Sequence, residues 1–188
     1  GLIVVADGMG GHARGELASD MTCTYFDGHG HNVDEKGNLF NLVDVADGAS
    51  MDVFEHSRRN PQTQGMGSTV VAARFLDNGT MQFVNVGDCR LYRFDLQQKT
   101  LEQLTEDHTF VWDLYNKGQL TKEKARLHNN KNIITQCIAG GAYPSFSYDN
   151  VKQHQRPIQA GDVYLLTVKE DEDGNKTTTV NGIRAGCK

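Results

Sequence analysis

The chain has 188 residues, 38% of them apolar, and its 19 basic and 24 acidic side chains leave a formal net charge of −5. This length supports about one domain with a sizeable core, and the composition excludes a disordered, collagen-like or coiled-coil chain. The negative charge also excludes the generic basic footprint of proteins that bind nucleic acid or an anionic membrane. We therefore expect no nucleic-acid or membrane partner. Any phosphate group should be bound by a few local residues rather than by an extended basic surface.

The cysteine spacing and the hydropathy of the chain disfavour further classes of protein. The four cysteines have no CxxC spacing, which disfavours a zinc knuckle and a disulfide scaffold. No apolar run approaches the ~20 residues that span a bilayer. We expect a cytoplasmic monomer whose residues 1–188 form a single domain. The chain opens directly on an apolar segment, so we also expect it to be a fragment.

The first third predicts one strand and two helices. A continuous apolar run over residues 2–6 ends at Asp7-Gly8, a pattern typical of a strand buried on both faces. A glycine-rich turn follows, and apolar residues then recur every four positions from Leu17 to Tyr25, as on one face of a helix. A similar pattern over residues 39–54 predicts the second helix.

The middle of the chain predicts antiparallel strands. Apolar runs over residues 69–75 and 81–86 flank Asp77-Asn78-Gly79, which is strong hairpin-turn chemistry. Two further strands, residues 90–94 and 101–105, extend this meander. Antiparallel strands combined with helices predict the α+β class.

The last part of the chain predicts a helix, a flap and two strands. A helical pattern over residues 110–116 is closed by Gly118, and we expect strands at 132–138 and 163–168. Residues 107–140 form a predicted flap, whose polar stretch from 117 to 131 has few apolar anchors and is expected to be mobile; the alternative for this stretch is an ordinary pair of surface helices. Residues 169–188 are atypical, with four successive acids and few large apolar side chains, and we expect a poorly anchored hairpin or tail.

Asp7-Gly8 is the first candidate for chemistry. A carboxylate at the end of a buried strand, followed by glycines, lets a side chain and a bare carbonyl face one cleft. Hard divalent cations such as Mg²⁺ and Mn²⁺ prefer these oxygen ligands. The alternative is an Asp-Gly turn that only starts a helix.

Several longer segments carry a family resemblance. VVADGMGGHARGELAS, residues 4–19, resembles the first motif of the type 2C (metal-dependent, PPM) protein serine/threonine phosphatases, in a form similar to bacterial members. The other matching segments follow in the family's order over residues 2–167. They are GMGST (65–69), FVNVGDCRLYRF (83–94), LTEDHTF (104–110), HNNKNIITQCIAG (128–140) and QAGDVYLLT (159–167).

The resemblance implies a fold and a reaction. The fold is a four-layer α-β-β-α sandwich of two antiparallel sheets flanked by helices. Two Mn²⁺ or Mg²⁺ ions, with a third weaker site, activate a bridging water that hydrolyses phosphoserine and phosphothreonine in proteins. Asp7 matches the residue that bridges the metals, Gly8 lends its carbonyl, and Asp88 matches the ligand of the third ion. The alternative for Asp88 is a turn aspartate between strands. The implied partners are phosphorylated proteins, the substrates of a partner kinase.

Departures from the family pattern lead to a second hypothesis. The phosphate-binding arginine and an acidic residue lie upstream of Gly1 in the family, and Lys169 stands where a metal ligand is expected. The closing Asp-Asn motif has no match in residues 177–188, and only a shifted register would bring in Asp171 or Asp173. We therefore expect a chain truncated at both ends with an impaired site. The alternative function is a non-catalytic phosphatase-like domain that binds a phosphoprotein or partner.

A histidine can serve as the proton donor to a leaving group. His128, which opens the segment ending the flap, is the candidate catalytic residue; the alternative for it and for His12, which the residues favour, is an ordinary position without a catalytic role. The alternating DGHGH segment, residues 27–31, predicts a solvated loop. DEDGNK, residues 171–176, has its glycine misplaced for a calcium loop and predicts a turn between strands.

Overall fold

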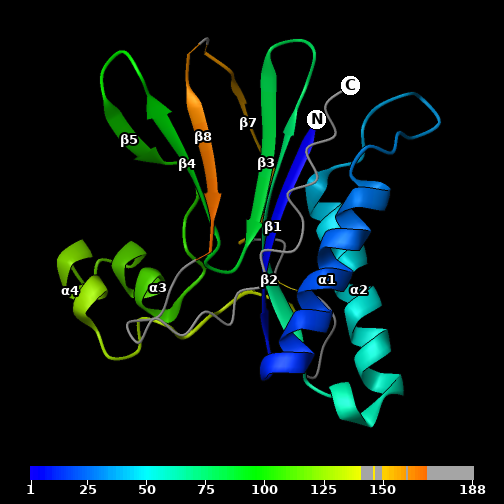
Figure 1. Cartoon of the computed structure of the whole chain (residues 1–188). Coiled ribbons are helices and arrows are strands. Elements are labelled where there is room, and N and C mark those ends of the chain that lie inside the picture. The colour runs from blue at the N-terminus through cyan, green and yellow to red at the C-terminus, as the bar shows by residue number, and fades with distance from the viewer. Residues whose placement is uncertain (141–145, 147–149, 160, 169–188) are drawn as a thin grey trace.

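The computed structural model describes residues 1–140, 146, 150–159 and 161–168, without the side chains of residues 12 and 13. Two antiparallel β-sheets pack against each other, and a pair of long helices covers one of them (Figure 1). The predicted α+β class, with two antiparallel sheets flanked by helices, is confirmed. Within the described ranges, no helix is long and apolar enough to cross a membrane.

The first sheet is built on the N-terminal strand. Its order is β1-β2-β3-β7, and the short β6 also pairs with β2. The strands are β1 (Leu2–Met9), β2 (Gly67–Phe75), β3 (Thr80–Val86), β6 (Ile138–Ala139) and β7 (His154–Pro157). The antiparallel register sets Asp7 opposite Thr69 and Gly8 opposite Ser68, so one end of this sheet carries the predicted metal ligands.

The second sheet has the order β5-β4-β8. Its strands are β4 (Arg90–Asp95), β5 (Thr100–Gln103) and β8 (Val163–Thr167). Arg93 of β4 is held to Asp162, just before β8, by two hydrogen bonds of 2.6 and 3.1 Å. This buried pairing ties a strand from the middle of the chain to one near its end.

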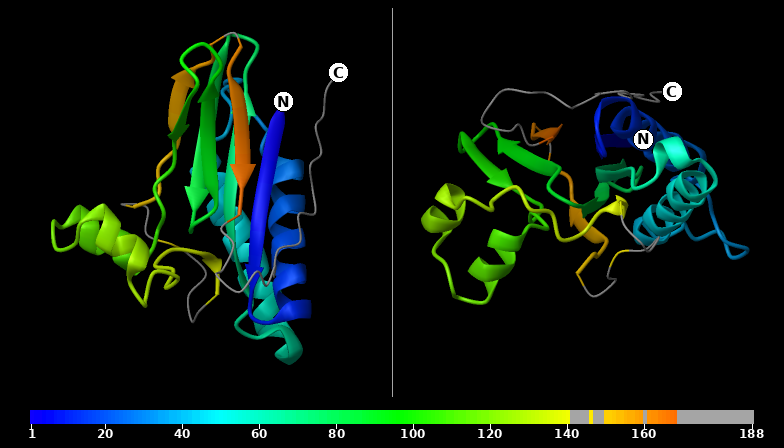
Figure 2. Two further views of the ribbon diagram at one scale, coloured as in Figure 1. Left: turned by 60° about the vertical axis from the view of Figure 1, so that its left-hand side comes forward. Right: turned by 90° about the horizontal axis from the view of Figure 1, so that it is seen from below.

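Helices α1 (His12–His29) and α2 (Leu42–Arg59) form the layer over the first sheet. The Asn41 side chain caps α2 by accepting a 2.8 Å hydrogen bond from the Val43 amide, which satisfies one of its free N–H groups. The short helix η1 (Pro61–Thr63) follows α2, while α3 (Phe110–Asn116) and α4 (Lys122–Leu127) lie beyond one end of the second sheet (Figure 2). The described residues thus supply three of the four layers expected, α-β-β.

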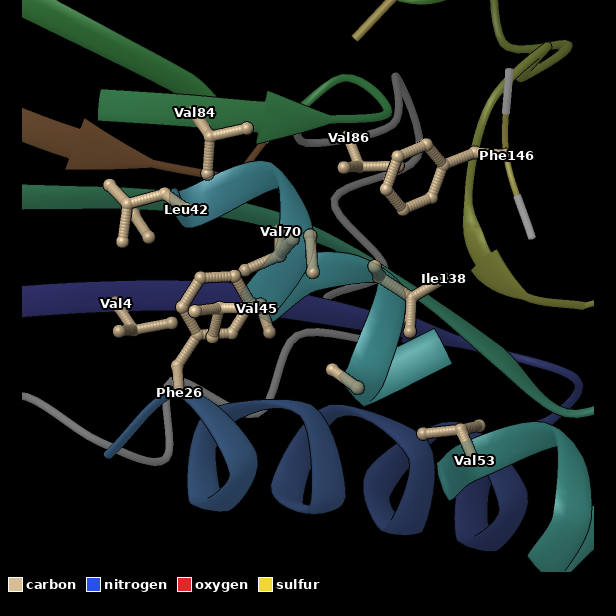
Figure 3. Close-up of a cluster of buried hydrophobic side chains, with 14 of the residues drawn as sticks. Val4, Phe26, Leu42, Val45, Val53, Val70, Val84, Val86, Ile138 and Phe146 are labelled. Carbon is tan, nitrogen blue, oxygen red and sulfur yellow. The ribbon is translucent and has the colours of Figure 1, made fainter. Parts of the chain in front are cut away.

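Alternating residues of the first sheet enter two separate cores. One set, with Val4, Val70 and Val84, packs against Phe26 of α1 and Leu42 of α2 (Figure 3). The other set faces the second sheet and comprises Val5, Val71, Ala73, Met81 and Phe83. Because β1 and β2 are buried on both faces, the end of β1 is held rigidly, as a site for a small ion requires.

Two of the predicted elements are wrong. Of the expected strand 132–138, only Ile138 lies in a sheet, in β6, because Thr135 donates its amide to the carbonyl oxygen of His108 rather than to a neighbouring strand. Residues 27–29 of the predicted loop belong to α1, where the His29 ring stacks on Tyr25 and hydrogen-bonds its carbonyl at 2.9 Å. The structure adds β7, which was not predicted, and α4, which agrees with the alternative of a surface helix pair. The predictions on residues 169–188 lie outside the described residues.

Candidate metal centre

Asp7 lies near the end of β1, between the buried Ala6 and Gly8, with its own side chain only partly accessible. Its Oδ1 atom is buried and has no hydrogen-bond partner in the described part of the chain. Burial, and second the negative charge of Asp88, raise the pKa of Asp7 to about 6. Among the described residues, no hydrogen bond to Oδ1 offsets the cost of burying an ionised carboxylate here. A bound cation would stabilise the ionised form.

Close backbone packing shapes the turn after Asp7. A Cβ atom on Gly8 would lie 1.8 Å from the carbonyl oxygen of Gly15 in α1, so only glycine fits there. Gly10 and Gly11 have φ angles of 115° and 88°, in the left-handed range that favours glycine. These glycines therefore allow the chain to reverse direction between the end of β1 at Met9 and the start of α1 at His12. This leaves a cavity of about 240 Å³, lined by Asp7, the next four residues, Thr69 and Ile134.

Asp88 lies in the turn after β3, between Gly87 and the buried Cys89. Its side chain is 8% exposed, and it is close enough to Asp7 for its charge to raise the pKa of that residue. The Thr69 hydroxyl, on the strand between them, forms a 3.0 Å hydrogen bond with the Cys89 thiol. The fold thus brings together two carboxylates that are 81 positions apart in the sequence.

His108 joins the turn of Asp88 to the start of the flap. Its Nδ1 accepts a 3.1 Å hydrogen bond from the Gly87 amide. Burial lowers the pKa of His108, so the neutral ring is favoured, as this acceptor role requires. His108 could not be assigned a role from the sequence; its place in LTEDHTF, directly after two acids, is the available signal.

Arg90 and Asp107 form the second connection. Arg90 Nε and Nη2 donate to the two carboxylate oxygens of Asp107 at 2.8 and 2.5 Å. Asp107 is 7% exposed and the Arg90 side chain is partly buried, so this bidentate pair is partly shielded from water. It anchors the segment leading into α3 to strand β4.

His128 lies elsewhere. It follows the last turn of α4, its Nδ1 accepts a 3.0 Å hydrogen bond from the Asn130 amide, and its ring is 6.3 Å from that of Phe110. It does not line the cavity at Asp7. Its catalytic role remains a prediction.

The available donor atoms are of the type that a hard divalent cation prefers. Asp7 and Asp88 offer carboxylates, Gly8 offers a carbonyl, and the unpaired buried oxygen of Asp7 is a group that a cation would satisfy. Within the described residues, no cluster of three or more His, Cys, Asp or Glu side chains could hold an ion. Lys169, Asp171 and Asp173, which bear on this count, lie outside those residues.

Comparison with known proteins gives a consistent picture. No family model matches the chain. The serine/threonine protein phosphatase PstP of Mycobacterium tuberculosis is 34% identical over 167 residues, which are 88% of this chain and 30% of PstP. The serine/threonine phosphatase stp of Listeria monocytogenes is 33% identical over 172 residues, 88% of this chain and 64% of that protein.

A solved structure extends the likeness to three dimensions. The catalytic domain of PstP in complex with two manganese ions superposes with a TM-score of 0.66 and 30% identity, over 88% of this chain and 65% of that one. The chain spans between 30% and 64% of the length of the two curated relatives.

Proposed function

Because the chain belongs to the metal-dependent (PPM, type 2C) family of protein serine/threonine phosphatases, we propose that it hydrolyses phosphoserine and phosphothreonine esters in proteins with the help of Mn²⁺ or Mg²⁺. The observation that carries this proposal is the unpaired, buried Oδ1 of Asp7 at the polar cavity, with Asp88 close by.

Asp7, Gly8 and Asp88 are the residues that would hold the ions. When bound, such ions activate water as a nucleophile and neutralise charge on the phosphoryl oxygens. No Ser, Cys or His nucleophile is needed for this chemistry. The candidate catalytic role of His128 is therefore confined to proton donation to the leaving group, which would require the end of α4 to approach the cavity.

The charge of the cavity argues for a cation requirement. Asp7 lines the cavity and Asp88 lies close to Asp7, so two carboxylates repel a phosphate dianion there, and no described side chain that lines the cavity is basic. Cations held by the two aspartates would remove this repulsion. Ser68 supports this arrangement by donating from its hydroxyl to the Asp7 carbonyl at 3.0 Å, which fixes the backbone of the ligand residue.

Calorimetry with Mn²⁺ and release of phosphate from a phosphothreonine peptide test the proposal. We expect weak Mn²⁺ binding and slow, Mn²⁺-dependent hydrolysis, both lost in Asp7→Asn and retained in Asp77→Asn, a control in the exposed hairpin turn. The rate should lie far below that of PstP from M. tuberculosis, because the described residues offer so few ligands.

Two results would overturn parts of this proposal. Tight Mn²⁺ binding that survives Asp7→Ala would refute the assignment of the ligand. Binding of the phosphopeptide without any Mn²⁺-dependent hydrolysis would favour the alternative, a non-catalytic domain that recognises phosphoproteins.

A further inference from the structure

A larger cavity, of about 300 Å³, lies where α3 and α4 meet the end of the second sheet. Its volume is at the lower end of the range for ligand pockets, about 300–1,000 Å³, so it suits a side chain or small molecule rather than a helix. It is formed by residues from β4, β5, both flap helices and the segment after them. None of the residues assigned to the metal centre lines it.

The charge of this flap pocket is opposite to that of the chain. Four basic side chains and one acidic side chain line it, in a chain of net charge −5. Arg90 is paired with Asp107, and the other basic side chains of the lining include Lys122 and Arg126. A pocket lined by more cationic than anionic side chains attracts an anion.

An apolar wall accompanies these charges. Trp112 lies against the pocket, with the Lys122 ammonium 5.7 Å from its ring centroid. The buried Val111 and Ala125 contribute further apolar surface. The Trp112 indole N–H is itself buried and without a hydrogen-bond partner among the described residues. Cations beside an aromatic ring suit a ligand with an anionic end on an apolar stem.

One segment connects the flap pocket to the metal centre. Asn132 lines the flap pocket, Ile134 lines the cavity at Asp7, and Thr135 lines a smaller cavity of about 100 Å³. Asp107 and Trp112 border both the flap pocket and that smaller cavity. Residues 132–135 therefore border all three cavities, so one short segment connects the flap pocket to the metal centre.

We propose that the flap pocket binds an acidic or phosphorylated side chain of the substrate protein, a few residues from the phosphorylated residue held at the metal centre. This inference rests on the proposed function for its second half, because the substrate is the same phosphoprotein. Binding to the pocket itself does not require hydrolysis. The pocket would thereby select acidic sequence contexts.

Trp112 provides a direct readout, because it is the only tryptophan of the chain. The metal-free chain is titrated with three phosphothreonine peptides that are identical except for alanine, glutamate or phosphoserine at positions on either side. We expect a saturable fluorescence change with at least about fivefold tighter binding of an anionic peptide than of the alanine peptide. Comparison of the glutamate and phosphoserine peptides identifies which anion the pocket takes.

Charge neutralisation tests the residues. The double variant Lys122→Gln/Arg126→Gln should lose this preference, while Lys36→Gln/Arg58→Gln, with the same change of charge at exposed positions outside the pocket, should keep it. Thermal melting confirms that both variants fold. Equal binding of all three peptides, or equal binding by the two double variants, would overturn the inference.

Turnover separates this inference from the proposed function. With Mn²⁺, the pocket variant should hydrolyse p-nitrophenyl phosphate at the unchanged rate but show a raised KM for the anionic peptide with unchanged kcat. Normal hydrolysis without any peptide preference would refute the pocket and leave the phosphatase proposal standing. Peptide preference without hydrolysis would refute the phosphatase proposal and leave the pocket.

Discussion

The metal-free chain should become more stable when its central candidate ligand is neutralised by Asp7→Asn. Burial and Asp88 raise the pKa of Asp7 from 3.8 to about 6 in the folded chain. The folded state therefore holds a proton that the unfolded state releases between these two values. Protonation of Asp7 therefore stabilises the folded state fully below pH 3.8, and this stabilisation is lost as the pH rises through about 6.

The size of the effect follows from the shift. About two pKa units correspond to roughly 3 kcal/mol, and partial exposure of the carboxylate reduces this through solvent screening to about 1–2 kcal/mol. At pH 7.5 the asparagine variant should exceed the parent by this amount, or by about 3–6 °C in melting temperature for a chain of this size. At pH 3.5 the two should coincide.

Urea unfolding of both proteins with EDTA at pH 3.5, 5 and 7.5 measures this difference, and Asp77→Asn serves as the exposed control. Added Mn²⁺ should stabilise the parent and leave Asp7→Asn unchanged, because only the parent binds it. An asparagine variant less stable than the parent at pH 7.5 would refute this prediction. A difference in unfolding free energy that did not shrink on acidification would also refute it, because the buried charge of Asp7 would then not be what destabilises the parent.

Three further outcomes are expected. Gly8→Ala should destabilise the fold by about 3 kcal/mol or more in urea unfolding and abolish Mn²⁺ binding, because its Cβ meets the Gly15 carbonyl; wild-type stability would contradict the packing described. Asp162→Asn should lower the melting temperature at pH 7, and the gap should close below pH 3.8, because Arg93 lowers the pKa of Asp162; a gap independent of pH would argue against the ion pair. Amides of residues 117–131 should exchange with solvent much faster than those of β2, since α4 buries so little; equally slow exchange would refute a mobile flap.

Strongly patterned segments could be predicted from the sequence, and weakly patterned ones could not. The apolar run before Asp7 predicts a buried strand, and the turn residues around Asn78-Gly79 predict a hairpin. Both are present in the structure. Residues 132–138 carry a similar apolar content, yet their backbone partners lie at the start of α3, more than twenty positions earlier. No local pattern records such a partner, so the period of the side chains misled the prediction.

The candidate site divides in the same way. Asp7 and Gly8 could be identified because their motif is local and the close approach of Gly15 demands glycine. The contacts of His108 and Asp107 could not, since each depends on a loop closing over the end of β3 or β4. The flap pocket was missed altogether, because its cations are spread over α4 and the following segment and become a cluster only in three dimensions.

The distribution of charge suggests how recognition and chemistry are divided. The cavity at Asp7 is acidic and repels phosphate until cations bind, whereas the flap pocket attracts anions without them. An anionic substrate can therefore be retained at the flap before its phosphoester enters the metal centre. The Arg90–Asp107 pair lines the flap pocket and fixes the start of the flap to the sheet. Loosening it by Arg90→Lys should consequently weaken the preference for anionic peptides while p-nitrophenyl phosphate turnover stays the same, since neither residue lines the cavity at Asp7.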